Sequence, residues 1–396
     1  MTTNILPLKG AIQHYHWGGY NYIPQLLNID NQNHQPFAEL WMGAHPSAPS
    51  IVKENGTETP LDVWIDQAPT TILGTSVALQ FQNRLPFLFK VLDVSKMLSI
   101  QAHPTKQQAE EGFQRENEMG IPFDAPHRNY KDDNHKPEIM VALTDFWLLH
   151  GFKPMEEVQA TIRTVPEFHP LQAIADTNSI YELYKYVMEM PPPEVDAMLK
   201  PLEQRLNTEN PAKNSPDYWA KRAFEDFPTQ NGHYDRGVFS IYFFHLVYLK
   251  PGEGIFQGAG IPHAYLEGVN VELMSNSDNV FRGGLTNKHV DVPELLKSLV
   301  FEPVNPNILS GTMLSTTEWV YLTPAPDFEL RKIEVNQQYS HYEKNDTPSI
   351  LIVLNGSVSV NGEHHFEKGG IFFVPAGVSF TIQAEEASTL FKASVP

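Results

Sequence analysis

Two polar side chains stand two residues apart at the end of a short apolar stretch in the segment LSIQAHPTK (98–106). Successive side chains of a strand point to opposite faces, so Gln101 and His103 would face the same side of an expected strand. They would lie about 7 Å apart along it, close enough to share one metal ion. On their own, they could equally be strand-end residues that bond to neighbouring loops.

A carboxylate and a second histidine occupy comparable positions further along the chain. In YKDDNHKPEIMVAL (130–143), Glu138 opens an apolar strand directly after a charged loop. In GAGIPHAYLEG (258–268), a Gly- and Pro-rich turn presents His263 at the start of another strand. The chain has no cysteine, so a metal site must use histidine and oxygen ligands. Two histidines, a carboxylate and an amide oxygen suit a divalent metal, although each could also be an ordinary packed or solvated side chain.

A few cations stand near these strands, in a chain whose formal net charge is -19. Arg282, in SNSDNVFRGGLTNKH (275–289), precedes two glycines, which allow a ligand to approach the guanidinium closely. With Lys90 and Lys136, it would suit a phosphate or a developing oxyanion. A lysine alone is more often a surface charge. The net charge argues against a nucleic-acid partner, because phosphate backbones require clustered Lys and Arg.

The elements that would position these residues are mainly β, with a helical insertion. Short apolar runs separated by Pro, Gly and Asn predict strands at 86–94, 97–104 and 136–143. Between 154 and 235, helical spacing of apolar residues, as in PPPEVDAMLKPLEQRL (191–206), predicts helices. From residue 237 onward we expect β structure again, with two strands within 237–268 and several more within 349–382, where Asn-Gly turns recur.

This order of elements predicts two jelly-roll barrels and a helical domain. Residues 1–153 and 236–310 would form a discontinuous catalytic barrel, residues 154–235 the helical insertion, and residues 311–396 the second barrel. That barrel carries His364 and His365, which would point to opposite faces, so we interpret it as structural or as a cover for the active site. The most apolar window, 240–249, is too short to span a bilayer, and the N-terminus lacks signal-peptide features, which favours a cytoplasmic protein.

Several separate motifs together resemble type I mannose-6-phosphate isomerase (phosphomannose isomerase), a family of the cupin superfamily. SIQAHP, NHKPE, PHAYLEG and SDNVFRGGLTNKH are similar to its signature segments, and YHWGG and ELWMGAHPSAPS to its opening segments. They follow the family's order across residues 13–289, and the helical insertion and the final barrel also fit. Leu273 stands where the family usually has cysteine and Gly283 where alanine is common, which leaves efficiency and exact substrate open.

The resemblance implies an enzyme that interconverts mannose 6-phosphate and fructose 6-phosphate through an enediolate, with one zinc ion per chain. It implies a catalytic Arg282, a Lys136 placed at the substrate, and the zinc ligands Gln101, His103, Glu138 and His263. We expect Lys90, Glu272 and Asp278 to bind the substrate, with Lys90 holding the phosphate. The general base could be Lys136, His135 or Glu272, and we favour Lys136.

Two other functions fit the same residues. One is a different metal-dependent cupin enzyme, such as an iron dioxygenase, although the amide ligand favours zinc. The other is a non-catalytic protein that binds a sugar phosphate, since one fold hosts many functions. As an isomerase, the chain is expected to be a monomer without nucleic-acid or membrane partners. Its product would supply GDP-mannose and glycan synthesis or enter glycolysis.

Overall fold

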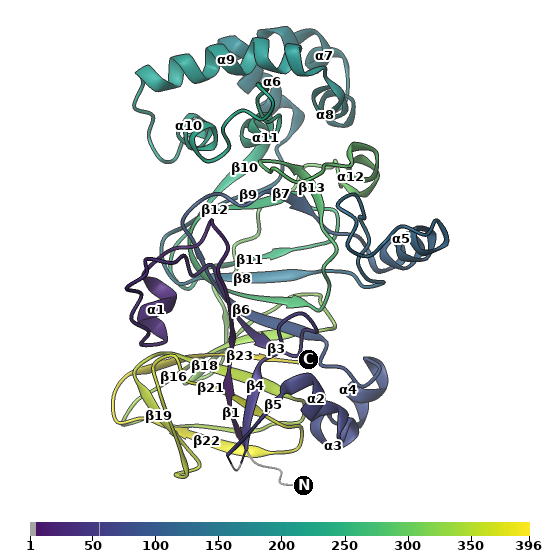
Figure 1. Cartoon of the computed structure of the whole chain (residues 1–396). Helices are drawn as coiled ribbons and strands as arrows, with labels where there is room; N and C mark the ends of the chain where they lie inside the picture. Colours follow the sequence, from purple (N-terminus) through teal and green to yellow (C-terminus); the bar gives the residue numbers. More distant parts are fainter. Residues whose placement is uncertain (1–4, 55) are drawn as a thin grey trace.

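The computed structural model describes residues 5–54 and 56–396, and the strands of these residues form three sheets (Figure 1). The first sheet has ten strands. They are β2 (Ala11–Gln13), β3 (Glu39–Gly43), β6 (Phe87–Val94), β7 (Ile100–Ala102), β8 (Glu138–Ala142), β9 (Phe146–Phe152), β10 (Phe244–Leu249), β11 (Gly254–Gln257), β12 (His263–Ser275) and β13 (Phe281–Gly284). β12 joins the sheet together, because it pairs with β7 and β9 near its start and with β6 and β8 further along.

The second and third sheets contain most of the last 85 residues, 312–396, together with three strands from the N-terminal part. The nine-stranded sheet contains β1 (Leu6–Lys9), β4 (Ile51–Glu54), β5 (Thr57–Pro60), β14 (Thr312–Ser315), β15 (Glu318–Tyr321), β16 (Glu329–Val335), β18 (Ser349–Asn355), β21 (Ile371–Val374) and β23 (Ser388–Ser394). The four-stranded sheet contains β17 (His341–Lys344), β19 (Ser357–Val360), β20 (His364–Glu367) and β22 (Ser379–Gln383). Because β1 pairs with β21, the N-terminal part of the chain is hydrogen-bonded to its C-terminal part.

The nine-stranded sheet is the middle layer of the β structure. One of its faces shares an apolar core with the ten-stranded sheet, in which Ile350 and Phe373 cluster with Phe89 and Leu273. Its other face packs on the four-stranded sheet through a second core that includes Leu351 and Phe372. This division follows from strand alternation, since neighbouring residues such as Ile350 and Leu351 point to opposite faces.

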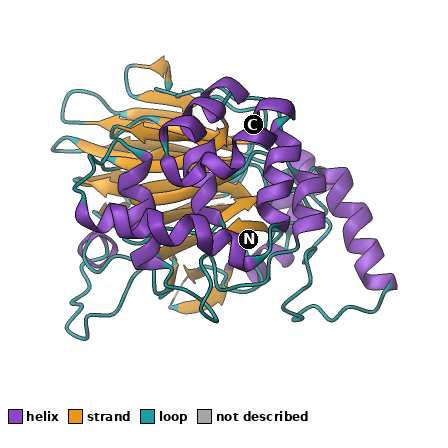
Figure 2. Cartoon of the chain, turned by 90° about the horizontal axis from the view of Figure 1, so that it is seen from above, coloured by secondary structure: helices purple, strands orange, loops and turns teal. Residues whose placement is uncertain are grey.

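Helices cover one end of the ten-stranded sheet (Figures 1 and 2). The predicted helical segment contains α6 (Met155–Thr164), the 3-10 helix η1 (Pro166–Leu171), α7 (Gln172–Thr177), α8 (Ile180–Glu189), α9 (Pro192–Thr208) and α10 (Pro216–Asp226), and α11 (Gly237–Phe243) follows it. The other helices are α1 (Tyr22–Leu26), α2 (Leu61–Asp66), α3 (Pro69–Leu73), α4 (Thr75–Gln80), α5 (Lys106–Glu118) and α12 (Val292–Ser298). Among the described residues, no helix combines the length and apolarity needed to cross a bilayer.

The prediction of a strand from residue 237 onward is wrong for its first seven residues. Residues 237–243 form α11, and the strand β10 starts only at Phe244. All seven residues of α11 are buried. A short apolar helix that is buried on every side has no polar face, so its sequence cannot be distinguished from that of a buried strand by periodicity.

Candidate metal centre and active site

Three predicted metal ligands converge from separate parts of the ten-stranded sheet. His103 follows β7, Glu138 is the first residue of β8, and His263 is the first residue of β12. The Nε2 atom of His103 lies 3.4 Å from Oε1 of Glu138, and Nε2 of His263 lies 3.3 Å from Oε2 of the same carboxylate. All three residues are buried, and their ligand atoms lie within 4.8 Å of one another.

The two imidazole rings are fixed by backbone carbonyls. Nδ1 of His103 lies 2.8 Å from the carbonyl oxygen of Asn279, and Nδ1 of His263 lies 2.9 Å from that of Ile261. A carbonyl oxygen only accepts hydrogen bonds, so each Nδ1 donates and each Nε2 lone pair points toward Glu138. Both Nε2 atoms and Oε2 of Glu138 are buried without a hydrogen-bond partner. Such a set of buried, unpartnered donor atoms fits a divalent metal ion.

The electrostatics of the group favour deprotonated ligands. Burial lowers the pKa of His103 to about 4, and Lys136 contributes in the same direction. Burial alone would raise the pKa of Glu138, but the nearby Lys136 and the two histidines outweigh it and hold that pKa well below its usual value. A neutral imidazole and an ionised carboxylate are the forms that bind metals.

Gln101 and Arg282 lie beside this group. Gln101 has His263 as its cross-strand partner on one side and Arg282 on the other. Cross-strand partners project from the same face of a sheet, so all three side chains belong to one row. The register shifts just after Arg282, where β13 continues through two glycines. A Cβ on Gly283 would lie 2.9 Å from a methyl of Ile100, so the glycine leaves room for that isoleucine.

Arg282 is the least compensated cation of the site. Burial lowers its pKa. Within the described residues, its side chain has no hydrogen bond or ion pair. An unpaired guanidinium in a partly buried place keeps all of its donors available for a ligand.

The two neighbours Lys136 and His135 point in different directions. Nζ of Lys136 lies 3.1 Å from Oε1 of Glu138, and the lysine is buried. Nε2 of His135 lies 2.8 Å from a carboxylate oxygen of Asp327, on the segment that precedes β16. His135 is therefore engaged with another part of the chain and does not join the metal ligands.

Lys90 and Glu272 form a buried ion pair on neighbouring strands. They are cross-strand partners of β6 and β12, and Nζ of Lys90 lies 3.2 Å from Oε1 of Glu272. A second carboxylate, that of Glu39, lies 3.4 Å from the same nitrogen and accepts a hydrogen bond from Trp41. Burial would lower the pKa of Lys90, but these carboxylates outweigh it and raise that pKa. The lysine charge is thus already balanced within the protein.

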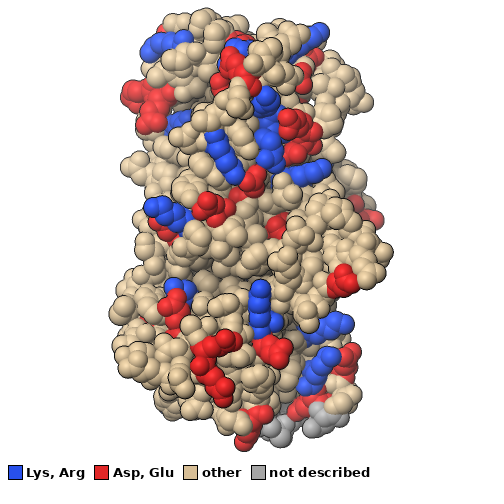
Figure 3. Space-filling view, turned by 90° about the vertical axis from the view of Figure 1, so that its left-hand side faces the viewer, with Lys and Arg blue, Asp and Glu red and all other residues tan. Residues whose placement is uncertain are grey.

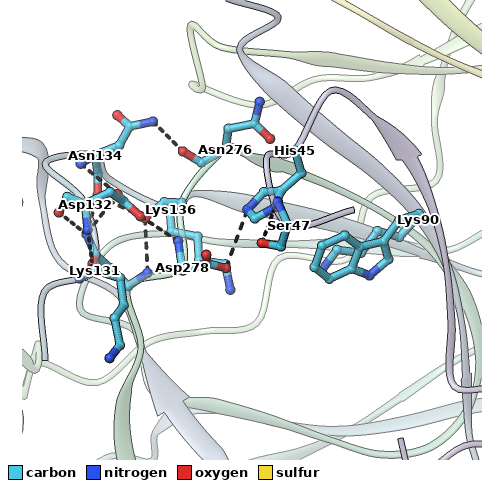
Figure 4. A network of polar contacts seen from close by, with 12 residues as sticks. His45, Ser47, Lys90, Lys131, Asp132, Asn134, Lys136, Asn276 and Asp278 are labelled. Atoms are coloured by element: carbon cyan, nitrogen blue, oxygen red, sulfur yellow. Dashed lines mark hydrogen bonds and ion pairs between the residues drawn. The ribbon is translucent and has the colours of Figure 1, made fainter. Parts of the chain in front are cut away.

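Asp278 lies near Lys136 and contacts His45, a histidine that the sequence did not indicate as a site residue (Figure 4). Its Oδ1 atom lies 3.5 Å from Nε2 of His45, whose other ring nitrogen contacts Ser47 at 2.9 Å. The contact with His45 lowers the pKa of Asp278. His45 stands in ELWMGAHPSAPS, which was noted only as a similar motif. No periodicity or spacing marks it as a site residue.

Two further buried residues near the metal ligands were also missed. His150 is a cross-strand partner of His263, and Gln257 is one of Glu138. Nδ1 of His150 lies 2.8 Å from Oε1 of Gln257, and burial lowers the pKa of His150 to about 4. Both come from unbroken apolar strands, where a polar residue gives a signal only once the pairing is known.

Charged side chains of both signs are interspersed over the face of the molecule in Figure 3. Since the chain as a whole is acidic, an anionic ligand must be held by individual cations such as Arg282.

Together, the buried His–Glu–His group, the free guanidinium and the adjacent lysine define a metal-dependent enzyme of mainly β structure. The sequence comparisons specify its family. Residues 5–155 match the profile of phosphomannose isomerase type I, catalytic domain. The chain is 39% identical to mannose-6-phosphate isomerase of Escherichia coli over 362 residues, which cover 89% of each protein. It is 34% identical to the human enzyme over 98% of this chain and 97% of that protein.

Solved structures agree with the sequence comparisons. The structure of mannose 6-phosphate isomerase from Salmonella typhimurium bound to fructose 6-phosphate and zinc superposes with a TM-score of 0.89 and 32% identity, over 99% of both chains. A zinc-bound mannose 6-phosphate isomerase structure gives the same values. The chain belongs to the type I phosphomannose isomerase family, and the resemblance seen in the sequence is confirmed.

Proposed function

We propose that this protein interconverts mannose 6-phosphate and fructose 6-phosphate with a zinc ion held by Gln101, His103, Glu138 and His263. The observation that carries the proposal is the set of three buried ligand atoms without hydrogen-bond partners, in a chain of this family. Gln101 is included because its strand position places it in the row of His263. One carboxylate and three neutral ligands leave the zinc site with net positive charge.

The reaction moves a proton between two neighbouring carbons and a carbonyl from one to the other. The main energetic obstacle is the negative charge that develops on the carbonyl oxygen when the proton leaves. Zinc, when bound, supplies a Lewis acid for the sugar oxygens. Arg282 stands next to the ligand row with its donors free, so we assign to it the stabilisation of the same negative charge.

We assign proton transfer to Lys136. Its side-chain nitrogen is held 3.1 Å from Glu138, beside the proposed metal ligands, and would accept the substrate proton as the neutral amine. Glu138 itself would be a poor base, because a bound metal would engage its lone pairs and its pKa is lowered by Lys136 and the histidines despite its burial. Glu272 remains the second candidate, since burial raises its pKa.

We also propose roles in substrate binding for the other polar residues of the site. Glu272 and Asp278 would accept hydrogen bonds from sugar hydroxyls, and Lys90 would orient Glu272 through their ion pair. Two carboxylates already balance the charge of Lys90, which weakens its attraction for a phosphate. We propose Lys288 as an additional cation for the phosphate. Burial lowers the pKa of Lys288, and the nearby charge of Arg282 lowers it further.

Our proposal also covers the domain boundaries, the oligomeric state, the localisation and the metabolic use of the product. We propose that residues 1–153 with 236–310, and residues 311–396, are two cupin-like barrels, and that 154–235 is the helical insertion. The ten-stranded sheet and the helices α6 to α10 support this division, whereas β1, β4 and β5 belong to the nine-stranded sheet with strands of residues 312–396. Because one chain supplies the complete set of proposed ligands, we propose that the protein is a monomer. We also propose that it is cytoplasmic and that its product serves GDP-mannose synthesis or glycolysis.

The test combines metal analysis with turnover. Purified protein is assayed for mannose 6-phosphate conversion and metal content before chelation, after chelation and after addition of Zn²⁺ or Mg²⁺. We expect activity to disappear with the metal and to return with Zn²⁺ but not with Mg²⁺, which prefers octahedral oxygen ligands. Full turnover in metal-free protein would refute the zinc site. A metal-loaded, folded protein with no isomerase activity would refute the reaction.

A further inference from the structure

A second group of metal-type side chains lies between the nine-stranded and four-stranded sheets, away from the site described above. Glu318 is on β15, and His341 and Glu343 are on β17. Their ligand atoms lie within 4.8 Å of one another. The cross-strand partners of Glu318 and His341 are Ile333 and Ile382, which belong to the apolar core between these two sheets. The group therefore points into the interior.

Two atoms of this group are buried and lack hydrogen-bond partners. Nε2 of His341 and Oε2 of Glu343 face each other at 3.5 Å, and the histidine is only 4% exposed. The other ring nitrogen of His341 is held by the hydroxyl of Thr317 at 3.1 Å. A buried polar atom without a partner loses its hydration without compensation, so two that converge indicate a missing ligand.

The arrangement repeats that of the first site. There, Nε2 of His263 faces the unpartnered Oε2 of Glu138 at 3.3 Å, and Lys136 binds the other carboxylate oxygen. Here, Lys392 binds Oε1 of Glu343 and leaves Oε2 toward the histidine. In both places a lysine occupies one oxygen of the carboxylate, while the other oxygen and an imidazole nitrogen remain available.

The charges around the group also favour a cation. Arg331 lies 2.9 Å from Glu318 and 2.5 Å from Glu329, and Lys392 lies 3.7 Å from Glu318 besides binding Glu343. Three carboxylates thus face one guanidinium and one ammonium group, with a histidine that is neutral when it acts as a ligand. One negative charge is left uncompensated in a largely buried place, where charge imbalance is costly.

We propose that Glu318, His341 and Glu343 form a second divalent-cation site, of the zinc type. One imidazole and two carboxylates suit Zn²⁺. Because the ligands come from β15 and β17, a bound ion ties the nine-stranded sheet to the four-stranded sheet. Its contribution is to stability, since a ligand that binds only the folded state shifts the unfolding equilibrium.

The test separates the two sites by substitution. Wild-type protein, His341→Gln, His103→Gln and the double variant are freed of metal and equilibrated with rising concentrations of free Zn²⁺. Bound zinc per chain is then measured by mass spectrometry. We expect two ions in the wild type at saturation, one in each single variant and none in the double variant. His341→Gln should keep isomerase activity, which also shows that it is folded, whereas His103→Gln should lose it.

A second measurement uses stability. Adding Zn²⁺ to His103→Gln should raise its thermal midpoint, and the double variant should show no such rise. Glu318→Gln, which keeps the size of the side chain, should behave like His341→Gln in case the latter folds poorly. The proposal is overturned if the wild type never exceeds one zinc ion per chain, or if both Glu318→Gln and His341→Gln bind as much zinc as the wild type.

Discussion

Replacement of Arg282 by alanine should abolish most catalysis without weakening the fold. The guanidinium is partly buried, and burial lowers its pKa. It has no ion-pair partner in the described part of the chain, so its removal leaves no carboxylate unpaired. Among the described residues, the variant therefore loses no hydrogen bond or ion pair within the protein, and we expect its main loss to be the interaction with the substrate.

The expected size of the effect follows from that geometry. Loss of one preorganised electrostatic donor at a developing oxyanion reduces kcat by about 10²–10³, or about 2.7–4 kcal/mol. The free energy of unfolding should stay unchanged or rise slightly, because an uncompensated buried charge is removed. Turnover of mannose 6-phosphate, thermal unfolding and zinc content are measured on the same preparation. Arg282→Lys keeps the charge without the planar fork and should recover only part of the rate.

Arg205 provides a matched control on α9. Its guanidinium contacts Glu167, Glu209 and Asp217, the nearest at 2.9 Å. Arg205→Ala should therefore lower the thermal midpoint and leave kcat unchanged, the opposite of the result expected for Arg282. Wild-type turnover in Arg282→Ala, or a loss of turnover that follows only from unfolding or loss of zinc, would refute the assignment.

Three further predictions concern buried charges. Lys136→Ala should lower kcat by about 10²–10⁴, and its pH–rate profile should lack the limb that reports the base. Lys90→Met leaves the buried carboxylates of Glu39 and Glu272 without their cation, so urea unfolding should show a loss of about 3–5 kcal/mol. Burial raises the pKa of Asp93 from 3.8 to about 6. The folded state then holds this proton more tightly than the unfolded state, so the carboxyl's contribution to stability is present at low pH and lost as pH rises from about 4 to about 6. Asp93→Asn should remove that dependence and stabilise the protein at pH 7 by about 1–3 kcal/mol, allowing for partial solvent exposure, as measured by thermal unfolding at several pH values.

Each of these has a result that contradicts it. An unchanged pH–rate profile in Lys136→Ala would exclude that lysine as the base and leave Glu272. Wild-type stability in Lys90→Met would mean that the two carboxylates are protonated or reached by water. A wild type and an Asp93→Asn variant whose stabilities run parallel between pH 4 and 8 would show that Asp93 titrates as it does in the unfolded chain.

The proposed metal ligands follow local rules that can be read from the sequence. Alternation along a strand predicts that Gln101 and His103 share a face, although β7 ends at Ala102, and Glu138 and His263 each open a strand after a loop. The same rule applies to His341 and Glu343, which are two residues apart on β17. The sequence does not show that they could share a metal ion with Glu318, because that residue comes close to them only through the packing of two sheets.

The sequence could not predict which buried charges form ion pairs. The sequence predicts Lys90 as a phosphate ligand, and the structure adds that β3 and β12 bring Glu39 and Glu272 within ion-pair distance of it. Those strands lie far apart in the chain, so no local pattern reveals the neutralisation. Alternation also implies that His135 and Lys136 point apart, but only the position of Asp327 decides which of them faces the metal ligands.

Asn279 shows how the loops of the site act as a unit. Its backbone carbonyl accepts the hydrogen bond from Nδ1 of His103, which fixes the tautomer of that ligand. Its side chain accepts from the backbone N–H of Lys131 at 2.7 Å and donates to the carbonyls of Asp132 and Asn134 at 2.9 Å each. The same fully buried residue thus holds both a metal ligand and the loop that leads to Lys136. Because those bonds are made together, a shift of that loop would also disturb the orientation of His103, so the positions of the metal ligand and of the proposed base are coupled through one amide.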